Sequence, residues 1–273
     1  MTPDPDMTPD DRQNTFSTDQ FLDGRLHLRQ PIKGHRIGTD ALLLASATQT
    51  KGRACDLGSG VGAIGLALVL RGCEDVVLVE KNPVFADCAQ ANIDQFAHKT
   101  TSNSARAQIV RADVFDRKTF LQCPLLANHS FDAVATNPPY DQALKGRHSP
   151  SELKLVAHDM QGGTLDDWLK VAVRLLKDGG VLTLIHRADR LQDVLAAMPK
   201  RAGGIAVLPV QPQSEQAATR IVVRAVAGSK AGLHLLPPLV LHRADGTFTD
   251  DGELIHKGRA TLTMRPGPVI QRI

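Results

Sequence analysis

The sequence is poor in the residues that build disulfide frameworks and zinc sites. Its 273 residues include four cysteines, with no Cys-x-x-Cys pair and no histidine spacing suited to zinc. We therefore expect reduced, mostly buried thiols and no bound metal. The sequence also lacks an apolar run of roughly 18 residues and an amino-terminal signal pattern, so we expect a cytoplasmic protein without a membrane span.

A strong excess of one charge is also missing. The formal net charge is +3, which permits contact with a polyanion but does not by itself indicate one. Hydrophobic residues make up 42% and charged residues 22% of the chain, the ordinary balance of a globular protein. We expect one principal core, and both a monomer and a dimer are compatible with the sequence.

Composition divides the chain into three parts. Residues 1–20 are rich in Pro, Asp, Thr and Gln and poor in apolar side chains, which predicts a disordered tail. Residues 21–230 have the pattern of one folded domain, beginning with a short hairpin from Phe21 to Ile32 and a helix capped by Thr39. Residues 231–273 mix prolines, basic residues and a turn signal, and we expect them to pack on the domain as an extension.

Within the domain, short β-rich runs alternate with helical segments. Asn82-Pro83 predicts the start of a helix towards Ala97, and Thr164 with Asp167 predicts the start of another that ends near Lys177. This alternation predicts an α/β fold with a mostly parallel seven-stranded sheet, an antiparallel edge strand and helices on both faces. The expected strands are 53–57, 75–80, 107–114, 131–137 and 181–187, followed by an antiparallel pair in IAVLPV and TRIVVRAV.

A glycine-rich loop follows the first expected strand of the sheet. In CDLGSGVGAIGLAL, Gly58, Gly60 and Gly62 stand between a strand and a helix, where bare backbone can approach a nucleotide closely. Glu80 ends the next strand, where a carboxylate can accept hydrogen bonds from the ribose hydroxyls of a cofactor. The loop also satisfies the dinucleotide-binding pattern, so a nicotinamide cofactor is one alternative and a tight structural turn is another.

Two further acids favour S-adenosylmethionine over a dinucleotide. Asp56 precedes the glycines, where an anion suits the ammonium group of this cofactor better than a pyrophosphate. Asp113 ends the third expected strand, where its carboxylate can accept a hydrogen bond from the amino group of the cofactor adenine.

The segment FDAVATNPPY is the most informative in the chain. Asn137, Pro138, Pro139 and Tyr140 follow the fourth expected strand, at the same end of the sheet as the glycine-rich loop. The Asn137 side-chain oxygen and the Pro138 carbonyl can each accept one N–H of an amine and aim its lone pair at a methyl donor. Tyr140 can stack on the target ring, and the alternative interpretation is a proline turn beside a core tyrosine.

Together, DLGSGVGAIGL, VEKNP, RADVF and NPPY resemble the amino-methylating class I methyltransferases, which have a Rossmann-like fold. HRIGTDALLLA and PPLVLHRADGTFTDD are similar to segments of the bacterial tRNA (adenine-N6)-methyltransferase family. The resemblance covers about residues 20–255 and implies methylation of an adenine next to the anticodon of a tRNA. By position it implies cofactor contacts from Asp56, Gly58, Gly60, Glu80 and Asp113, a catalytic Asn137–Tyr140 segment, and a cofactor-site wall at Thr39 and Asp40.

Basic residues downstream are candidate RNA contacts. Lys145 and Arg147 lie in an expected substrate loop at 141–163, and Arg220 lies in a later strand. Any one of them could equally be part of a solvated surface. Further candidate phosphate contacts are Arg201, Arg224, Arg243, Lys257 and Arg259.

Two other functions fit parts of this pattern. Protein-glutamine methyltransferases that act on release factors also use NPPY, with a side-chain amide in place of the base amine. A catalytically idle RNA-binding protein could keep the fold, since fold alone does not fix function. The retained Asn137 and Glu80 argue against an idle protein.

Overall fold

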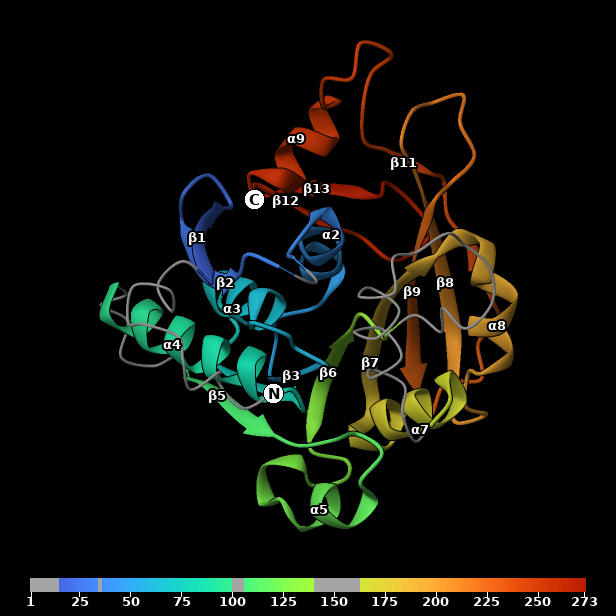
Figure 1. The fold of residues 1–273 in the computed structure, drawn as a ribbon. Coiled ribbons are helices and arrows are strands. Elements are labelled where there is room, and N and C mark those ends of the chain that lie inside the picture. Colours follow the sequence, from blue (N-terminus) through green and yellow to red (C-terminus); the bar gives the residue numbers. More distant parts are fainter. Residues whose placement is uncertain (1–14, 34–35, 100–105, 140–162) are drawn as a thin grey trace.

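The computed structural model describes residues 15–33, 36–99, 106–139 and 163–273. One large sheet organises this part of the chain (Figure 1), and its long strands lie in the order β8-β9-β7-β6-β3-β4-β5. Their bounds are β3 (Arg53–Leu57), β4 (Asp75–Glu80), β5 (Arg106–Arg111), β6 (Phe131–Thr136), β7 (Leu176–Arg187), β8 (Ala202–Gln211) and β9 (Arg220–Ala227).

The mostly parallel sheet predicted from the sequence is confirmed, with a difference at one side. Strand β9 is antiparallel to both β7 and β8, so the antiparallel strand lies inside the sheet rather than at its edge. Two short strands, β10 (His234–Leu235) and β11 (Leu239–Val240), pair with β8 and bring the sheet to nine strands.

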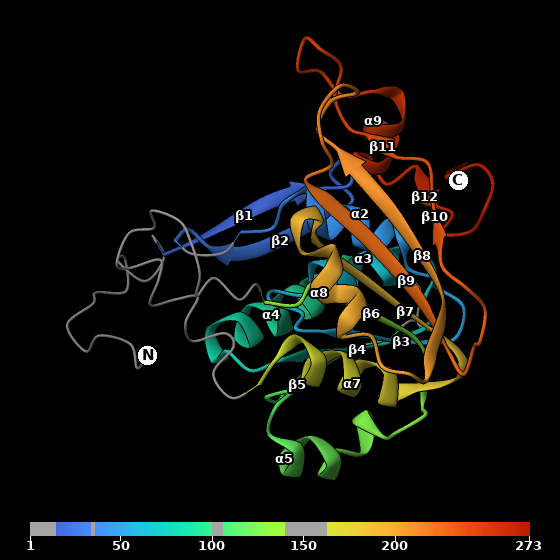
Figure 2. The ribbon, with the colours of Figure 1, turned by 90° about the vertical axis from the view of Figure 1, so that its right-hand side faces the viewer.

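Helices cover both faces of the sheet, as Figure 2 shows. Strand residues alternate between two apolar clusters, so that Val76 and Leu78 belong to one cluster and Val77 and Val79 to the other. Burial on both faces explains why these strands read as nearly continuous apolar runs. One face carries α2 (Thr39–Ala47), α3 (Ala63–Leu70) and α4 (Pro83–Lys99), and the other carries α5 (Arg117–Gln122), α7 (Leu165–Leu175) and α8 (Leu191–Ala196), with short 3-10 helices η1 (Pro124–Leu126) and η2 (Ala188–Arg190).

Local capping explains where two of these helices begin. The Asn82 side chain accepts a hydrogen bond from the Val84 N–H at 2.9 Å, directly before Pro83 opens α4. At α7, Thr164 and Asp167 form a reciprocal capping box. Both starts agree with the sequence.

Two other predicted boundaries are wrong. Thr39 is the first residue of α2 and not its cap; Gly38 occupies the cap position without a side-chain hydrogen bond. The α7 helix stops at Leu175, before the expected end near Lys177, and β7 runs from Leu176 through the glycine pair Gly179-Gly180. A register shift between β6 and β7 takes up the extra residues, which is why a glycine pair can lie within this strand.

Residues 16–20, expected in a disordered tail, instead form most of β1 (Phe16–Phe21). This strand pairs antiparallel with β2 (Leu26–Pro31), and Leu26 and Leu28 anchor the hairpin in the core. The Arg29 guanidinium lies over the Phe16 ring at 4.4 Å. Pairing with an anchored neighbour therefore orders a polar segment that could not bury enough surface alone.

The C-terminal part of the chain forms α9 (Asp250–His256) and a hairpin of β12 (Ala260–Leu262) and β13 (Ile270–Arg272). Figure 1 shows these elements beside α2. Ile255 and Leu262 are buried in the same apolar cluster as the leucines of α2. This segment also contacts the β1–β2 hairpin, because Arg25 donates hydrogen bonds to the carbonyls of Lys257 and Gly258 at 2.6 and 2.8 Å.

Candidate functional site

The glycine-rich loop and Asn137 lie at the carboxyl end of the sheet, where its parallel strands end. Leu57 of β3 pairs in register with Thr136 of β6, so the residues that follow them, Gly58 and Asn137, leave neighbouring strands at the same level. The Thr136 hydroxyl donates a hydrogen bond to the Leu57 carbonyl at 2.8 Å. The end of β6 is thereby tied directly to the start of the loop.

The three glycines of the loop differ in how closely other side chains approach them. Gly58, Gly60 and Gly62 all have positive φ, at 76°, 55° and 89°, the region that favours glycine. A Cβ at Gly58 would lie 2.9 Å from the Trp168 ring, and one at Gly62 would lie 2.8 Å from Leu78. A Cβ at Gly60 would meet no atom within 4 Å. Gly58 and Gly62 therefore serve packing, whereas Gly60 borders open space.

Glu80 holds the loop in place. Its carboxylate accepts hydrogen bonds from the backbone N–H of Gly60 at 2.9 Å and of Asn82 at 2.7 Å. The side chain sits at the last position of β4 and is almost buried. Because each carboxylate oxygen can accept more than one hydrogen bond, Glu80 can anchor the loop and still receive a ligand hydroxyl.

Asp56 is fully buried beneath the loop. One carboxylate oxygen accepts a hydrogen bond from the Gly65 N–H at 2.8 Å, at the start of α3. The other oxygen, Oδ1, has no hydrogen-bond partner among the described residues. Burial raises the pKa of Asp56 to about 7, against the lowering effect of the Gly65 hydrogen bond, and the nearby charge of Glu80 adds to the rise. A cationic group bound next to Asp56 would lower the free-energy cost of burying its ionised carboxylate.

Asp113 stands two residues beyond β5, which is shorter than the strand we expect from the sequence. Its side chain is half-buried and accepts a hydrogen bond from the Phe115 N–H at 2.9 Å. This contact shapes the turn that leaves the sheet, close to where β4 presents Glu80, because β4 and β5 are parallel neighbours.

Trp168 is a site residue that sequence reasoning misses. Its indole N–H donates to the Thr136 hydroxyl at 2.9 Å, which extends the link from β3 and β6 to α7. The Trp168 ring also closes against Gly58 and meets Phe115 edge-on, with ring centroids 5.8 Å apart. The signal was available, because Trp168 is the one tryptophan of the chain and lies on the apolar side of a capped helix.

Asn137, Pro138 and Pro139 follow β6 as expected. Asn137 and Pro139 are half-buried and Pro138 is buried. The last residue of this motif, Tyr140, lies outside the described residues, as do Lys145 and Arg147.

Asp40 and Arg220 contact each other, although the sequence assigns them to different ligands. The Arg220 Nε lies 2.9 Å from an Asp40 carboxylate oxygen, which joins the first turn of α2, next to Thr39, to the start of β9. Other candidate phosphate contacts are also held in ion pairs or hydrogen bonds. Arg201 pairs with Asp178 at 2.7 Å, Lys257 with Glu253 at 2.6 Å, Arg259 with Asp23 at 2.6 Å, and Arg243 with Asp250.

The described residues contain neither a cluster of metal ligands nor a membrane-spanning helix. No group of three or more histidine, cysteine or acidic side chains there could hold a metal ion. Within the same ranges, no helix is both long and apolar enough to cross a membrane.

Comparison with known proteins identifies the kind of site. The family model described as "Methyltransferase small domain" matches residues 33–208. A tRNA1(Val) (adenine(37)-N6)-methyltransferase from Haemophilus influenzae is 29% identical over 174 residues, which cover 62% of this chain and 68% of the relative. A release factor glutamine methyltransferase from Bifidobacterium longum is 33% identical over 148 residues, or 50% of this chain and 49% of the relative.

One solved structure is similar over most of the described fold. It is the crystal structure of a predicted O-methyltransferase from Agrobacterium tumefaciens, with a TM-score of 0.66 and 30% sequence identity. The similarity covers 81% of this chain and 97% of that one. The residues matched by the family model, 33–208, include the glycine-rich loop and the strands on either side of it.

Proposed function

The chain belongs to the methyltransferase small-domain family and is an S-adenosylmethionine-dependent methyltransferase, and from this premise we propose that it methylates N6 of an adenine in tRNA. The observation that carries the proposal is the hydrogen bond from the Thr136 hydroxyl to the Leu57 carbonyl. It holds the amine-binding residue Asn137 beside Gly58, the first residue of the cofactor loop.

Three features of the loop suit S-adenosylmethionine. The open space beside Gly60 leaves room for the ligand, and the two oxygens of Glu80 retain capacity for ribose hydroxyls. The unpartnered oxygen of Asp56 suits the ammonium group of the cofactor, which would offset the cost of a buried carboxylate. The bound cofactor supplies an activated methyl group.

The protein side of the reaction is mainly positioning. The amine of adenine is a poor nucleophile because its lone pair is delocalised into the ring. In our proposal the Asn137 side-chain oxygen and the Pro138 carbonyl each accept one of its N–H groups, so the lone pair points at the methyl donor. The positive charge that develops on nitrogen meets these two fixed dipoles, and the methylated nitrogen then loses a proton.

The remaining assignments concern the RNA. We propose that Tyr140 stacks on the target adenine, a contact worth roughly 1–3 kcal/mol, and that Lys145 and Arg147 contact the RNA backbone. Arg220 and Asp40 form one unit at the mouth of the site, so that Arg220 orients Asp40 as well as facing the substrate. Because tRNA is the proposed substrate, we also propose that the protein acts in the cytoplasm.

A protein glutamine is the second candidate substrate. The similarity to a release factor glutamine methyltransferase supports it, since the same two acceptors could grip a side-chain amide. That similarity covers about half of each chain. The similarity to the tRNA methyltransferase from Haemophilus influenzae covers a larger share of both this chain and the relative.

One experiment separates these functions. The protein is incubated with methyl-labelled S-adenosylmethionine and, in separate reactions, with tRNA, rRNA, DNA or release factor, and the labelled product is hydrolysed and identified. We expect label in N6-methyladenosine from the tRNA reaction. Label in glutamine of the release factor would establish the second candidate, and label in another nucleoside would overturn the adenine assignment.

A further inference from the structure

A polar hollow lies at the opposite end of the sheet from the candidate site. It has a volume of about 190 Å³ and is bordered by the ends of α2 and α3, the strands β7 and β9, and the β12–β13 hairpin. Because α2 and α3 end just before the strands β3 and β4 begin, this is the amino end of the sheet. Three arginines line it: Arg71, Arg224 and Arg265. We call them the arginine cluster.

The arginine cluster lacks compensating charge. None of its members forms an ion pair with any described residue, and none of the described residues that line the hollow is acidic. Several other arginines of the described chain are paired with acids, as Arg53 is with Asp75 at 2.8 Å. Three guanidinium groups around one hollow repel each other, and a bound anion would offset this repulsion.

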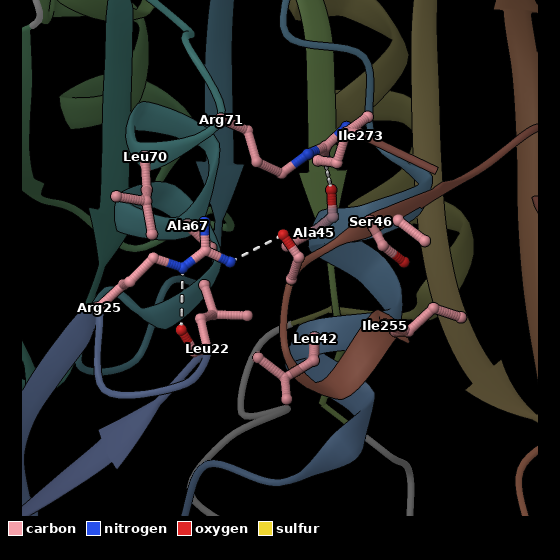
Figure 3. A pocket seen from close by; sticks show the side chains of 12 residues that line it. Leu22, Arg25, Leu42, Ala45, Ser46, Ala67, Leu70, Arg71, Ile255 and Ile273 are labelled. Carbon is pink, nitrogen blue, oxygen red and sulfur yellow. Dashed lines mark hydrogen bonds between the residues drawn. The ribbon is translucent and has the colours of Figure 1, made fainter. Parts of the chain in front are cut away.

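Arg71 is held in place by backbone groups rather than by an acid. Its guanidinium donates hydrogen bonds to the carbonyls of Ala45 and Thr48, the latter at 3.0 Å. Its Nε is buried and has no partner among the described residues. Figure 3 shows the side chain reaching from the end of α3 towards Ala45, on one side of a smaller cavity of about 60 Å³. Burial lowers the pKa of Arg71 to about 10.

Arg224 and Arg265 approach the hollow from separate elements. Arg224 lies on β9 two residues from Val222, whose side chain belongs to the α2 side of the sheet. Arg265 follows β12 and is exposed. Burial and the charge of Arg265 both lower the pKa of Arg224. The two charges are therefore close enough to interact unfavourably, and no described acid offsets them.

We propose that the arginine cluster binds a phosphoryl group. Guanidinium groups bind phosphate oxygens through paired N–H donors, which makes arginine well suited to this ligand. The walls between the arginines carry neutral polar side chains, among them Thr263 and Gln271, that can complete the hydrogen bonding. The group can belong to the RNA backbone or to a small phosphorylated molecule. This site does not depend on the proposed methyl transfer, because it lies at the other end of the sheet.

Thermal unfolding of the full chain in sodium phosphate, against sodium chloride of equal ionic strength, tests the proposal. We expect phosphate at roughly ten times its Kd to raise the Tm of the parent protein by about 3 °C. The double variant Arg224→Gln/Arg265→Gln should lose this shift. The matched control Arg187→Gln/Arg190→Gln removes two exposed, ion-paired arginines away from the hollow and should keep it.

An equal phosphate shift in the parent and in both variants would overturn the proposal, as would no shift in the parent. If the double variant does not fold, Arg265→Gln alone decides, because this exposed residue can be changed without disturbing the core; it should lose at least half of the shift. Binding of a labelled tRNA pool identifies the source. The quantity compared is the slope of the logarithm of the tRNA binding constant against the logarithm of the salt concentration. If this slope falls in magnitude by about 0.7–0.9 for each arginine removed, the ligand is an RNA phosphate. If the slope is unchanged in the variant while the parent keeps its phosphate shift, the ligand is a small phosphorylated molecule.

Discussion

The two ends of the sheet use the backbone in opposite ways. At the carboxyl end, Asp56 and Glu80 accept hydrogen bonds from backbone N–H groups at the start of α3 and in the loop before it. At the amino end, Arg71 donates to backbone carbonyls at the end of α2. A parallel α/β fold presents helix N-termini at one end of the sheet and helix C-termini at the other. Free N–H groups at the first end favour acids as partners, and free carbonyls at the second favour arginines.

This difference predicts different ligands. Two acids at the amino end are paired with other cations, since Asp75 contacts Arg53 and Asp132 contacts Lys177, each at 2.8 Å, so neither of them pairs with the arginine cluster. At the carboxyl end the unpartnered oxygen belongs to Asp56, an acid. We therefore expect a cationic group beside Asp56 at the carboxyl end and a phosphoryl group beside the arginine cluster at the amino end.

The largest effect is expected from substitution of Asn137 after β6, and the same substitution of an asparagine before β6 serves as its control. Asn137→Ala should reduce turnover by on the order of a hundredfold or more and leave cofactor binding intact, because alignment of the amine is lost. Asn128→Ala makes the same chemical change just before β6, at an exposed position, and should leave turnover unchanged. Rates with methyl-labelled cofactor and calorimetric binding measure both effects. Turnover of Asn137→Ala within a few-fold of the parent would refute the proposed role.

Two glycines provide the next comparison. Gly60 and Gly72 both have positive φ, at 55° and 93°, and both border open space, but Gly60 lies in the cofactor loop and Gly72 in the turn before β4. Alanine at either position should cost about 1 kcal/mol of stability through backbone strain. Only Gly60→Ala should weaken S-adenosylmethionine binding, by roughly tenfold or more, because its methyl group enters the ligand space. Equal affinities in calorimetry would show that the cofactor does not approach Gly60.

Two buried threonines differ in the hydrogen bonding of their hydroxyl groups, and we expect different effects on stability when each is replaced. Thr136 joins Leu57 to Trp168 by two hydrogen bonds, whereas the Thr183 hydroxyl in β7 has no partner among the described residues. Thr136→Val should lower the free energy of unfolding by about 1–3 kcal/mol, because it leaves two buried groups unpaired. Thr183→Val should be neutral or stabilising in denaturant titrations. A smaller loss for Thr136→Val than for Thr183→Val would break the proposed link.

The smallest effect is a pH dependence from Asp56. Its pKa in the folded protein is about 7, above the usual 3.8, so the folded state retains a proton that the unfolded state releases. This group therefore favours folding below about pH 4, and the benefit is lost as the pH rises to about 7. A cationic ligand prefers the ionised form, so cofactor affinity should rise roughly eightfold between about pH 6 and 7.5, in proportion to the ionised fraction of Asp56. Asp56→Asn should show a flat profile, and a profile like the parent's would exclude Asp56 as the titrating group.

The carboxyl end of the sheet could be predicted from the sequence because its signals are local. Gly58 and Glu80 each stand at the end of an apolar run, and Asn137 follows another, so parallel pairing brings them together without further information. The contact between Asp40 and Arg220 could not be predicted, since these residues are 180 positions apart and come from different layers.

The arginine cluster as a whole could not be predicted, although the sequence indicates Arg224 as a candidate phosphate contact. Arg71 follows a helix, Arg224 lies within a strand, and Arg265 lies between β12 and β13, so no short motif unites them. The hairpin itself was missed because β12 and β13 have three residues each, too few for a periodic pattern. The start of α9 did carry a signal, because Thr249 followed by Asp250, Asp251 and Glu253 is a typical helix start.

The contact between the amino-terminal hairpin and the segment after α9 has a consequence for synthesis. Arg25 and Lys257 are separated by 232 residues, so their hydrogen bond can form only when nearly all of this chain has left the ribosome. Until then the apolar side of α2 that later covers Ile255 and Leu262 faces water or a chaperone. The contact between the β1–β2 hairpin and the segment after α9 therefore forms late in folding. A ribosome stalled before α9 would carry a partly folded chain with exposed apolar surface, which is prone to aggregate.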